Sequence, residues 1–537
     1  MDINGCTFSK LPFSSLFQTY ISNFSKLSSL YTYNPLRDAD IEKRSKQLKG
    51  GTHRTDYITA LKDYHTSLGI EEEQDAPLQK LRQDNVLTVV TGQQLGVYGG
   101  PLFTVYKTAT AILLARKWEE KLNRPVVPVF WMADEDHDFD EIAWTGILGR
   151  KDFHKIKLDK EGNNFAVADQ LINAEFLSFK EKVKEELFDT DFTEALWSQL
   201  QGYYKEGHTH GQAFARLINH WFAKEGVLIA GSNYPAVKEL LKAELKHSIE
   251  EADPIHQAIE KQSTEVDEGY HQQVTNGDTN LFYVSKEQGR VKIQKDGSGW
   301  KAADTNWNHE QLLQAIEDQP HAFSPNVFMR PILQDKLLPT LGYVAGPGEI
   351  AYYAQMKKLY HEFDLEMPVI FPRLSITLIE SGISRITEKL PFDFSDYSKR
   401  IEDLEKEFVE QADTPDLEAV FGKWKQDIQS TTERPSKVIN EIDPTLDGTV
   451  GKTIAGFSNE LDKLKGKVYR SIKQQEVTQI KRIEKIKVNL FPDGGLQERS
   501  VSPVYFMNKY GLDIWSKLID ELEEQELDLS THHLIHL

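Results

Sequence analysis

The stretch that decides the fold runs from Asn85 to Ile142 and reads NVLTVVTGQQLGVYGGPLFTVYKTATAILLARKWEEKLNRPVVPVFWMADEDHDFDEI. Val86–Val90 is a short apolar run with β-branched residues, which predicts a strand buried on both faces. A glycine-rich loop follows, and from Pro101 to about Leu122 apolar residues recur at helical spacing. Val126–Met132 is a second apolar run. This order predicts a βαβ unit with two parallel strands.

Polar residues come directly after both predicted strands. The first strand is followed by Thr91–Pro101, which contains four glycines as well as Gln93 and Gln94, and the second by Asp134–Asp138. Open α/β sheets bind ligands beyond the carboxyl ends of their strands. The loop is neither G-x-G-x-x-G nor a Walker P-loop, so it indicates neither a dinucleotide site nor that NTPase site. We expect a ligand site of another kind, with a merely tight connection as the alternative.

The run Asp134–Asp138 places four carboxylates and one imidazole in five residues. Such groups cannot all be buried together in charged form, because like charges raise one another's pKa. Their oxygens could bind Mg²⁺ or a substrate amine. We select Asp134, Asp136 and His137 as catalytic candidates, with His137 as a possible general base. A solvated acidic turn is the alternative.

Composition sets the broad class. Of 537 residues, 39% are apolar and 27% charged, and the net charge of −20 argues against a surface for nucleic acid or anionic membranes. The single cysteine, Cys6, excludes an intramolecular disulfide and argues against a Cys-based zinc site, and we assign no residue as a metal ligand. No run approaches the roughly 18 apolar residues of a membrane span, and no signal peptide is evident. We expect a cytoplasmic protein.

Further strands and excursions indicate an α/β fold with a Rossmann-like parallel-sheet core. The runs Gly226–Gly231 and Val369–Phe371 predict additional strands. We divide the chain into a Rossmann-like catalytic core, a helical coiled-coil domain and a C-terminal return to the core. These comprise residues 1–385, 386–490 and 491–537, with inserted subdomains in the core at about 143–215 and 253–323.

A coiled-coil pattern marks the helical domain. Apolar residues recur at spacings of three, four, three and four at Ile454, Phe457, Leu461, Leu464 and Val468, with a stutter near Glu476. We expect two long antiparallel helices, with a helical domain packed flat on the core as the alternative. The pattern leaves open whether the coil pairs two chains or folds on itself.

A second glycine segment, Gly346–Glu349, precedes a helix expected over Ile350–Phe363. Glu349 could be stabilised by the helix dipole or could face the first loop across the cleft. Arginine can bind a carboxylate or phosphate through two hydrogen bonds, which makes Arg330 a binding candidate. Gly348 and Tyr352 complete the candidates of this segment.

Three motifs together resemble a known family. TGQQ-x-G-x-x-GGP begins at Thr91, E-D-H-D-F-x-E-I at Glu135, and VAGPGE-x-A-Y at Val344. Over essentially the whole chain the sequence resembles the cysteine-adding enzyme of bacillithiol biosynthesis, the cysteine ligase of that pathway. The resemblance implies a Rossmann-like core and a long coiled coil associated with homodimerisation.

The resemblance also implies an activity. The family's ascribed role is the last step of bacillithiol synthesis, which joins the cysteine carboxyl to the amine of glucosaminyl malate as an amide. A nucleoside triphosphate must activate the carboxyl, so ATP/ADP binding is expected and Mg²⁺ is possible. An adenylate and an acyl-phosphate are both open, and neither a HIGH nor a KMSKS match is evident.

The resemblance further implies site residues. The substrate pocket would be lined by the first loop, with the acidic cluster opposite. A nucleotide is also associated with the family near the coiled coil, and Arg499 and Lys509 are the candidates for that second site. The loop residues implied in the pocket are Thr91, Gly92, Gln93, Gln94 and Gly96, and those opposite are Asp134, Asp136 and His137.

A function of another class competes with the ligase. The same cleft and coiled coil would suit a non-catalytic assembly or regulatory protein that binds a metabolite and recruits a partner.

Overall fold

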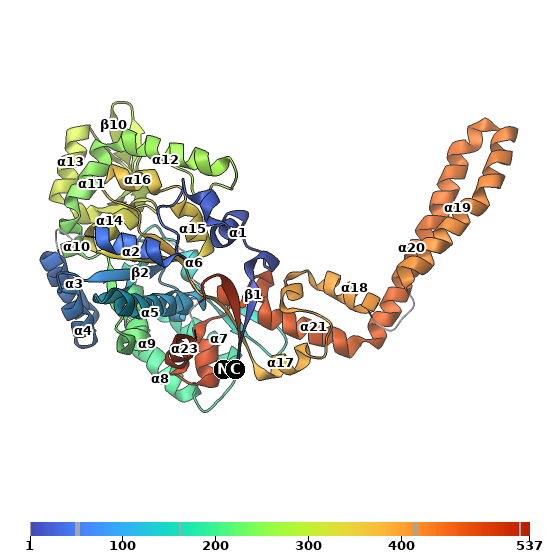
Figure 1. The fold of residues 1–537 in the computed structure, drawn as a ribbon, viewed down its shortest axis with the longest axis horizontal. Helices are drawn as coiled ribbons and strands as arrows, with labels where there is room; N and C mark the ends of the chain where they lie inside the picture. Colours follow the sequence, from blue (N-terminus) through green and yellow to red (C-terminus); the bar gives the residue numbers. More distant parts are fainter. Residues whose placement is uncertain (1, 49–53, 160–162, 412–415, 526–527) are drawn as a thin grey trace. The chain divides into compact units, whose positions relative to one another are not determined.

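The computed structural model describes residues 2–48, 54–159, 163–411, 416–525 and 528–537. The chain forms two compact units (Figure 1). The first comprises Met1–Leu378 and Leu496–Ile535, and the second comprises Ile379–Gly495 and His536–Leu537. The C-terminal segment therefore returns to the first unit after the chain has built the second.

A five-stranded parallel sheet forms the centre of the first unit. Its order is β14-β13-β2-β3-β6, and every neighbouring pair is parallel. The strands are β2 (Leu87–Gln93), β3 (Val126–Met132), β6 (Leu228–Gly231), β13 (Thr340–Ala345) and β14 (Val369–Pro372). Parallel alignment places the carboxyl ends of all five strands at one edge, so the segments that follow them meet there.

Apolar runs explain why these strands form the core. All seven residues of β3 are buried, as expected of a central parallel strand with both faces covered. The helix α5 (Phe103–Leu122) connects β2 to β3 and packs on both. Trp118 from α5 and Trp131 from β3 are among the largest fully buried side chains. The predicted Rossmann-like βαβ unit is confirmed.

The remaining elements of the first unit surround this sheet. The N-terminal helices are α1 (Ser15–Ser22), α2 (Asp38–Gln47), α3 (Arg54–Leu68) and α4 (Glu71–Leu81). Between β3 and β6 lie α6 (Phe139–Ile142), β4 (Trp144–Leu148), β5 (Phe153–Lys157), α7 (Ala174–Glu186), α8 (Thr193–Tyr203) and α9 (His210–Phe222).

A second excursion separates β6 from β13. It contains α10 (Pro235–Leu240), α11 (Lys242–Glu250), α12 (Ala252–Asp267), α13 (His309–Asp318) and α14 (Met329–Leu337). Its strands form two small antiparallel sheets, β12-β7-β8 and β11-β10-β9. They are β7 (Leu281–Ser285), β8 (Gly289–Lys292), β9 (Gln294–Asp296), β10 (Gly299–Ala302), β11 (Thr305–Trp307) and β12 (Phe323–Pro325).

The predicted helix Ile350–Phe363 is wrong in its continuity. The structure has α15 (Pro347–Tyr353) and α16 (Lys357–Glu362) instead. Between them the buried side chain of Gln355 accepts hydrogen bonds from the backbone N–H groups of Gln273 and Val274. This turn therefore fixes a loop of the second excursion.

The C-terminal return adds helices and a strand. They are α22 (Pro503–Tyr510), α23 (Ile514–Glu524) and β16 (Thr531–His536). The strand β16 lies between β1 (Asp2–Thr7) and β15 (Ser375–Ile379) in a three-stranded sheet. The two ends of the chain are thus joined by strand pairing.

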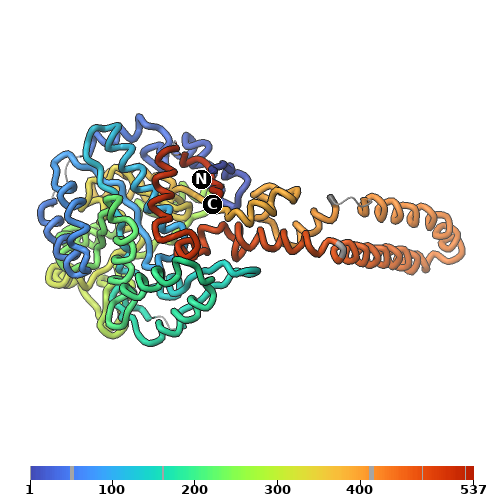
Figure 2. The backbone as a smooth tube through the Cα atoms, turned by 90° about the horizontal axis from the view of Figure 1, so that it is seen from below, coloured from blue at the N-terminus to red at the C-terminus, as the bar shows by residue number. Residues whose placement is uncertain are grey.

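The second unit is helical. It contains α17 (Ser381–Thr387), α18 (Ile401–Gln411), α19 (Leu417–Ile442), α20 (Asp447–Gln475) and α21 (Val477–Leu490). Figure 2 shows α19 and α20 side by side as a hairpin. Ion pairs Lys425–Asp462 and Lys465–Glu418 join the two helices in antiparallel register. The predicted pair of long antiparallel helices is confirmed, and this pairing is within one chain.

The predicted apolar seam of α20 divides into two neighbouring rows that differ in burial. Leu461 is buried, and Ile454 and Val468, one heptad to either side, are half-buried. Phe457 and Leu464 alternate with them and remain 50% and 41% exposed. The hairpin itself thus uses only one row of the seam. The predicted stutter near Glu476 falls at the break between α20 and α21.

Among the described residues, none of the helices is both long and apolar enough to cross a membrane.

Candidate active site

A cavity of about 660 Å³ lies in the first unit, beyond the carboxyl ends of β2, β3 and β13. Its walls come from the loop after β2, the acidic cluster after β3, the turn after β13 and parts of both excursions and the C-terminal return. The strand ends predicted to converge therefore share one pocket.

Most predicted site residues line this cavity. They are Gly92, Gln93, Gln94, Asp134, Asp136, Arg330, Gly348, Glu349, Tyr352 and Arg499. Thr91, Gly96, His137 and Lys509 are not among the described residues that line it. Thr91 is buried and donates a hydrogen bond to the carbonyl of Val344 at 3.1 Å. Of the two candidates for a nucleotide site, Arg499 lines this cavity and Lys509 does not.

The glycines of the first loop serve two purposes. A Cβ at position 92 would lie 3.3 Å from Arg330 Nη1 and from the Tyr343 hydroxyl, so Gly92 leaves room for these groups. Gly99 has a φ of 89°, and a Cβ there would come within 2.5 Å of the Trp221 ring. Gly99 thus permits internal packing, whereas Gly92 borders the cavity.

A buried ion pair links the two glycine segments. Lys107 of α5 pairs with Glu349 of α15, and its ammonium also donates to the Gly92 carbonyl at 2.9 Å and the Gln93 side-chain oxygen at 3.0 Å. Burial lowers the pKa of Lys107, and Glu349 opposes that shift. Because Lys107 holds the Gln93 oxygen, the Gln93 amide nitrogen remains available to a ligand.

Gln94 joins two carboxylates of the cavity wall. Its amide nitrogen donates to Asp136 at 2.7 Å and to Glu141 at 2.6 Å. Asp136 also accepts the backbone N–H groups of His137 and Asp138. Burial would raise the pKa of Asp136, but Gln94, Arg290 and these N–H groups lower it. Asp136 is therefore a charged acceptor.

Asp134 has the opposite character. Burial, reinforced by the neighbouring Glu135 carboxylate, raises the pKa of Asp134 to about 8. Glu135 pairs with the buried ammonium of Lys238 at 2.5 Å and accepts from Ser232. The Asp134 carboxyl also lies against Gly231, where any Cβ would collide with it. Asp134 thus holds a proton at neutral pH.

His137 does not line the cavity itself but contacts Arg290, which does. The Arg290 guanidinium donates to His137 Nδ1 at 3.1 Å and lies over the Phe282 ring, with 3.9 Å between its Cζ and the ring centroid. Burial and the Arg290 charge lower the pKa of His137. A neutral imidazole therefore orients a cation that lines the pocket.

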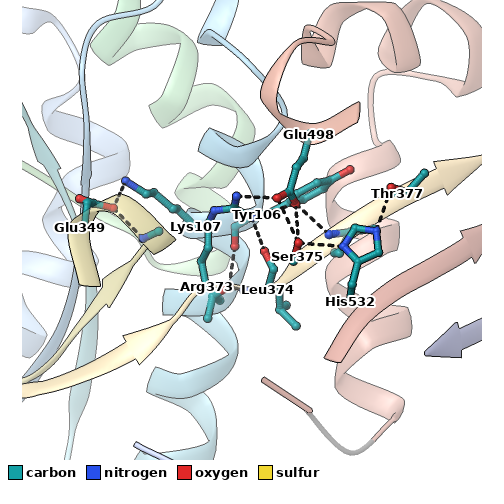
Figure 3. A network of polar contacts seen from close by, with 12 residues as sticks. Tyr106, Lys107, Glu349, Arg373, Leu374, Ser375, Thr377, Glu498 and His532 are labelled. Carbon is teal, nitrogen blue, oxygen red and sulfur yellow. Dashed lines mark hydrogen bonds and ion pairs between the residues drawn. The ribbon is translucent and has the colours of Figure 1, made fainter. Parts of the chain in front are cut away.

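The C-terminal return supplies a buried network behind the cavity (Figure 3). Glu498 accepts two hydrogen bonds from Arg373, at 2.8 and 2.6 Å, and others from the Ser375 hydroxyl and the Ile376 N–H. His532 lies between the hydroxyls of Ser375 and Thr377. Burial lowers the pKa of His532 to about 4, so its ring is neutral. Arg373 itself reaches the cavity wall.

Sequence reasoning missed several wall residues. Glu141 lies within the motif that begins at Glu135, so the motif carried a signal for it. Arg290 and Lys292 come from β8, in an excursion with no recognisable motif. Only tertiary contacts bring them to the cavity. Among the described residues no group of three His, Cys, Asp or Glu side chains is arranged to hold a metal ion.

Together these features define a Rossmann-like α/β protein with a charged small-molecule cavity at the carboxyl edge of its sheet. Residues 1–374 match the family model described as Bacillithiol biosynthesis BshC, N-terminal Rossmann-like domain, and residues 376–537 match the C-terminal coiled-coil domain of the same family. The chain therefore belongs to the BshC family of bacillithiol biosynthesis.

Full-length relatives agree with this assignment. The chain is 31% identical to a protein of Salinibacter ruber, over 97% of this chain and 96% of that protein. It is 32% identical to one from Chloroherpeton thalassium (95% and 94%) and 31% identical to one from Chlorobaculum tepidum (98% and 97%). Each relative is named "Putative cysteine ligase BshC". The predicted family, fold and enzyme class are confirmed at this level.

Proposed function

We propose that the protein is an ATP-dependent ligase that joins the carboxyl group of cysteine to the amine of glucosaminyl malate, the last step of bacillithiol synthesis. Membership of the BshC family supports the cysteine ligase and its pathway. The observation that carries the chemical proposal is Asp134, a carboxyl whose pKa is raised to about 8 and which lines the same cavity as Gln93 and Gln94.

Amide formation requires a neutral amine and an activated carboxyl. The amine nitrogen attacks the carboxyl carbon, the C–N bond forms, and the bond to the phosphate-containing leaving group breaks with its electron pair. The amine must lose a proton, and the fraction of Asp134 that is ionised accepts it. A base with a pKa near the working pH is the most effective one, and about 8 meets that condition.

Other wall groups bind and orient the substrates. Asp136 is a charged acceptor suited to an ammonium or a sugar hydroxyl, and the free amide edge of Gln93 suits a neutral polar group. His137 acts through Arg290, whose guanidinium it orients. ATP would supply the activation energy. Asp136 and Glu141 are the wall carboxylates whose oxygens would hold an accompanying Mg²⁺.

The coiled-coil unit pairs two chains. In α19, Val420 and Trp424 lie four residues apart, as do Val438 and Ile442, and the two pairs are separated by 18 residues, or about five helical turns. All four side chains are between 47% and 79% exposed. Such a row of exposed apolar residues supports a homodimer. The proposed use of ATP supports a cytoplasmic location.

Reconstitution tests the proposal. Purified protein is incubated with cysteine, ATP and glucosaminyl malate, and the products are identified by mass spectrometry. We expect the amide product together with AMP, if an adenylate forms, or ADP, if an acyl-phosphate forms. Asp134→Asn is expected to remain folded and lose at least about a hundredfold in kcat, the usual contribution of a general base. No amide product from the wild-type protein, or full turnover by Asp134→Asn, would refute it.

A further inference from the structure

The charges of the cavity wall do not balance. Three of the ion pairs described above involve wall residues and neutralise Lys107, Glu135 and Arg373. The wall carboxylates left outside these pairs are Asp136 and Glu141, together with Asp134, which is mainly protonated at neutral pH. All three lie on the side of the wall formed after β3.

Four wall cations remain outside these pairs: Arg290, Lys292, Arg330 and Arg499. In the described part of the chain, no carboxylate forms an ion pair with any of them. They outnumber the remaining ionised carboxylates even if Asp134 is counted as charged. A positive cavity in a chain of net charge −20 indicates recognition of an anion.

The C-terminal turn presents Arg499 in a defined position. The Gln497 side chain bonds both backbone groups of Leu378 at 2.9 Å, and Glu498 is held by Arg373 and the start of β15. Arg499 is the next residue and is exposed at the cavity. Its backbone is therefore fixed by two buried neighbours while its guanidinium is free to bind.

The other two cations approach from different elements. Lys292 at the end of β8 lies against Gly277, at a position where a Cβ would contact its ammonium. Arg330 of α14 donates to the Tyr352 hydroxyl at 2.9 Å, and its Nη1 lies near Gly92. Two guanidinium groups and one ammonium thus border the same cavity, and guanidinium groups bind carboxylate and phosphate oxygens through paired hydrogen bonds.

We propose that Lys292, Arg330 and Arg499 form a subsite for a dianionic oxygen group of the substrate, either a dicarboxylate or a phosphate. The proposal rests on the proposed ligase function, whose two larger substrates carry these two groups. The surplus of positive charge favours a group with two negative charges over one.

Binding of small probes tests the subsite directly. Malate and inorganic phosphate are each titrated calorimetrically into the full-length wild-type protein and the variants Arg499→Gln and Lys292→Gln. Lys286→Gln is the matched control, because Lys286 is exposed on the β7–β8 hairpin and does not line the cavity. Thermal unfolding verifies that each variant is folded.

We expect each subsite variant to weaken binding of one probe at least about tenfold, because charged hydrogen bonds contribute on that scale, while the control leaves it unchanged. A loss for malate identifies a dicarboxylate, and a loss for phosphate identifies a phosphate group. If neither probe binds the wild-type protein, or if both bind all variants equally, the proposal is overturned.

Failure of the subsite can be separated from failure of the ligase function. If the wild-type protein makes the amide but neither KM, for ATP or for glucosaminyl malate, rises in the subsite variants, the subsite is wrong and the function stands. If probe binding depends on Arg499 and Lys292 but no amide forms, the ligase proposal fails and the anion subsite remains.

Discussion

The guanidinium of Arg373 and the carboxylate of Glu498 form a bidentate ion pair that is buried in the first unit, with N–O distances of 2.8 and 2.6 Å. Arg373 follows β14 of the central sheet, and Glu498 lies near the start of the C-terminal return, so all the helices of the second unit lie between them in sequence. This pair fixes the return against the sheet and holds Arg373 at the cavity wall.

We expect Glu498→Gln to destabilise the first unit. The substitution leaves the buried Arg373 charge without its partner, and breaking a buried pair in this way costs about 3–5 kcal/mol. The free energy of unfolding in urea measures the effect, followed by a signal from the first unit. Glu524→Gln, at an exposed position of α23, is the control and should change stability by less than about 0.5 kcal/mol. A loss below about 1 kcal/mol would contradict a structural role for the pair.

The pKa of Asp134 makes a prediction about stability and pH. Its folded pKa of about 8 lies above the ordinary value of 3.8, so the folded protein holds a proton that the unfolded chain has released. The stability contribution of this group is therefore fully present below about pH 4 and is lost as pH rises to about 8.

The variant Asp134→Asn lacks this titration. We expect its stability relative to the wild-type protein to increase steadily from pH 4 to pH 8 and to level off above pH 8. Urea unfolding at several pH values within that window measures the difference. A difference that is constant with pH would show that Asp134 titrates normally and is not the proton acceptor proposed above.

The sequence predicts the sheet and the coiled coil because both follow from local patterns. The run Val126–Met132 coincides with β3, and the heptad-like spacing around Leu461 marks α20. The cavity could be predicted only in part, since its loop and acidic cluster directly follow strands. Arg290 and Lys292 lie on β8, which pairs with β7 in a small antiparallel sheet far from the first loop in sequence. No local sequence pattern indicates that this strand borders the cavity.

Local sequence patterns also failed to indicate the roles of two candidate residues, Gly96 in the first loop and His137 in the acidic cluster. Gly96 was expected in the pocket, but a Cβ there would meet Gly100, so its role is the folding of the loop on itself. His137 was selected as a possible base, and its ring instead accepts a hydrogen bond from Arg290. Residue type and spacing alone did not distinguish ligand contact from internal packing.

Gly231 is predicted to be required by its contact with Asp134. In Gly231→Ala the new methyl group would collide with the Asp134 carboxyl, which must turn away. We expect a loss of about 1–3 kcal/mol in stability, the usual cost of overpacking, together with a fall in kcat. A double-mutant cycle with Asp134→Ala measures the coupling in urea. Because the shortened side chain removes the collision, the double variant should recover most of the stability lost by Gly231→Ala, and purely additive losses would contradict this contact.

The exposed apolar residues of the helical hairpin predict a dimer, and introducing charges among them should dissociate it. Phe457 of α20 and Trp424 of α19 are 50% and 47% exposed, although the coiled-coil pattern marks Phe457 as a seam position. We expect the wild-type protein to sediment as a dimer at micromolar concentration, and Phe457→Lys combined with Trp424→Lys to sediment as a monomer, because a lysine at each position would place like charges in an apolar contact.

The matched control for this prediction is Gln426→Lys combined with Asn459→Lys. Both residues are exposed and lie two positions along the same helices, about 200° around the helix axis from the apolar row, so the control adds the same charge to another face. We expect the control to remain dimeric. Sedimentation velocity over a hundredfold range of concentration distinguishes the outcomes. A wild-type monomer throughout that range, or a dimer that persists in the Phe457 and Trp424 variant, would show that the exposed row does not pair two chains.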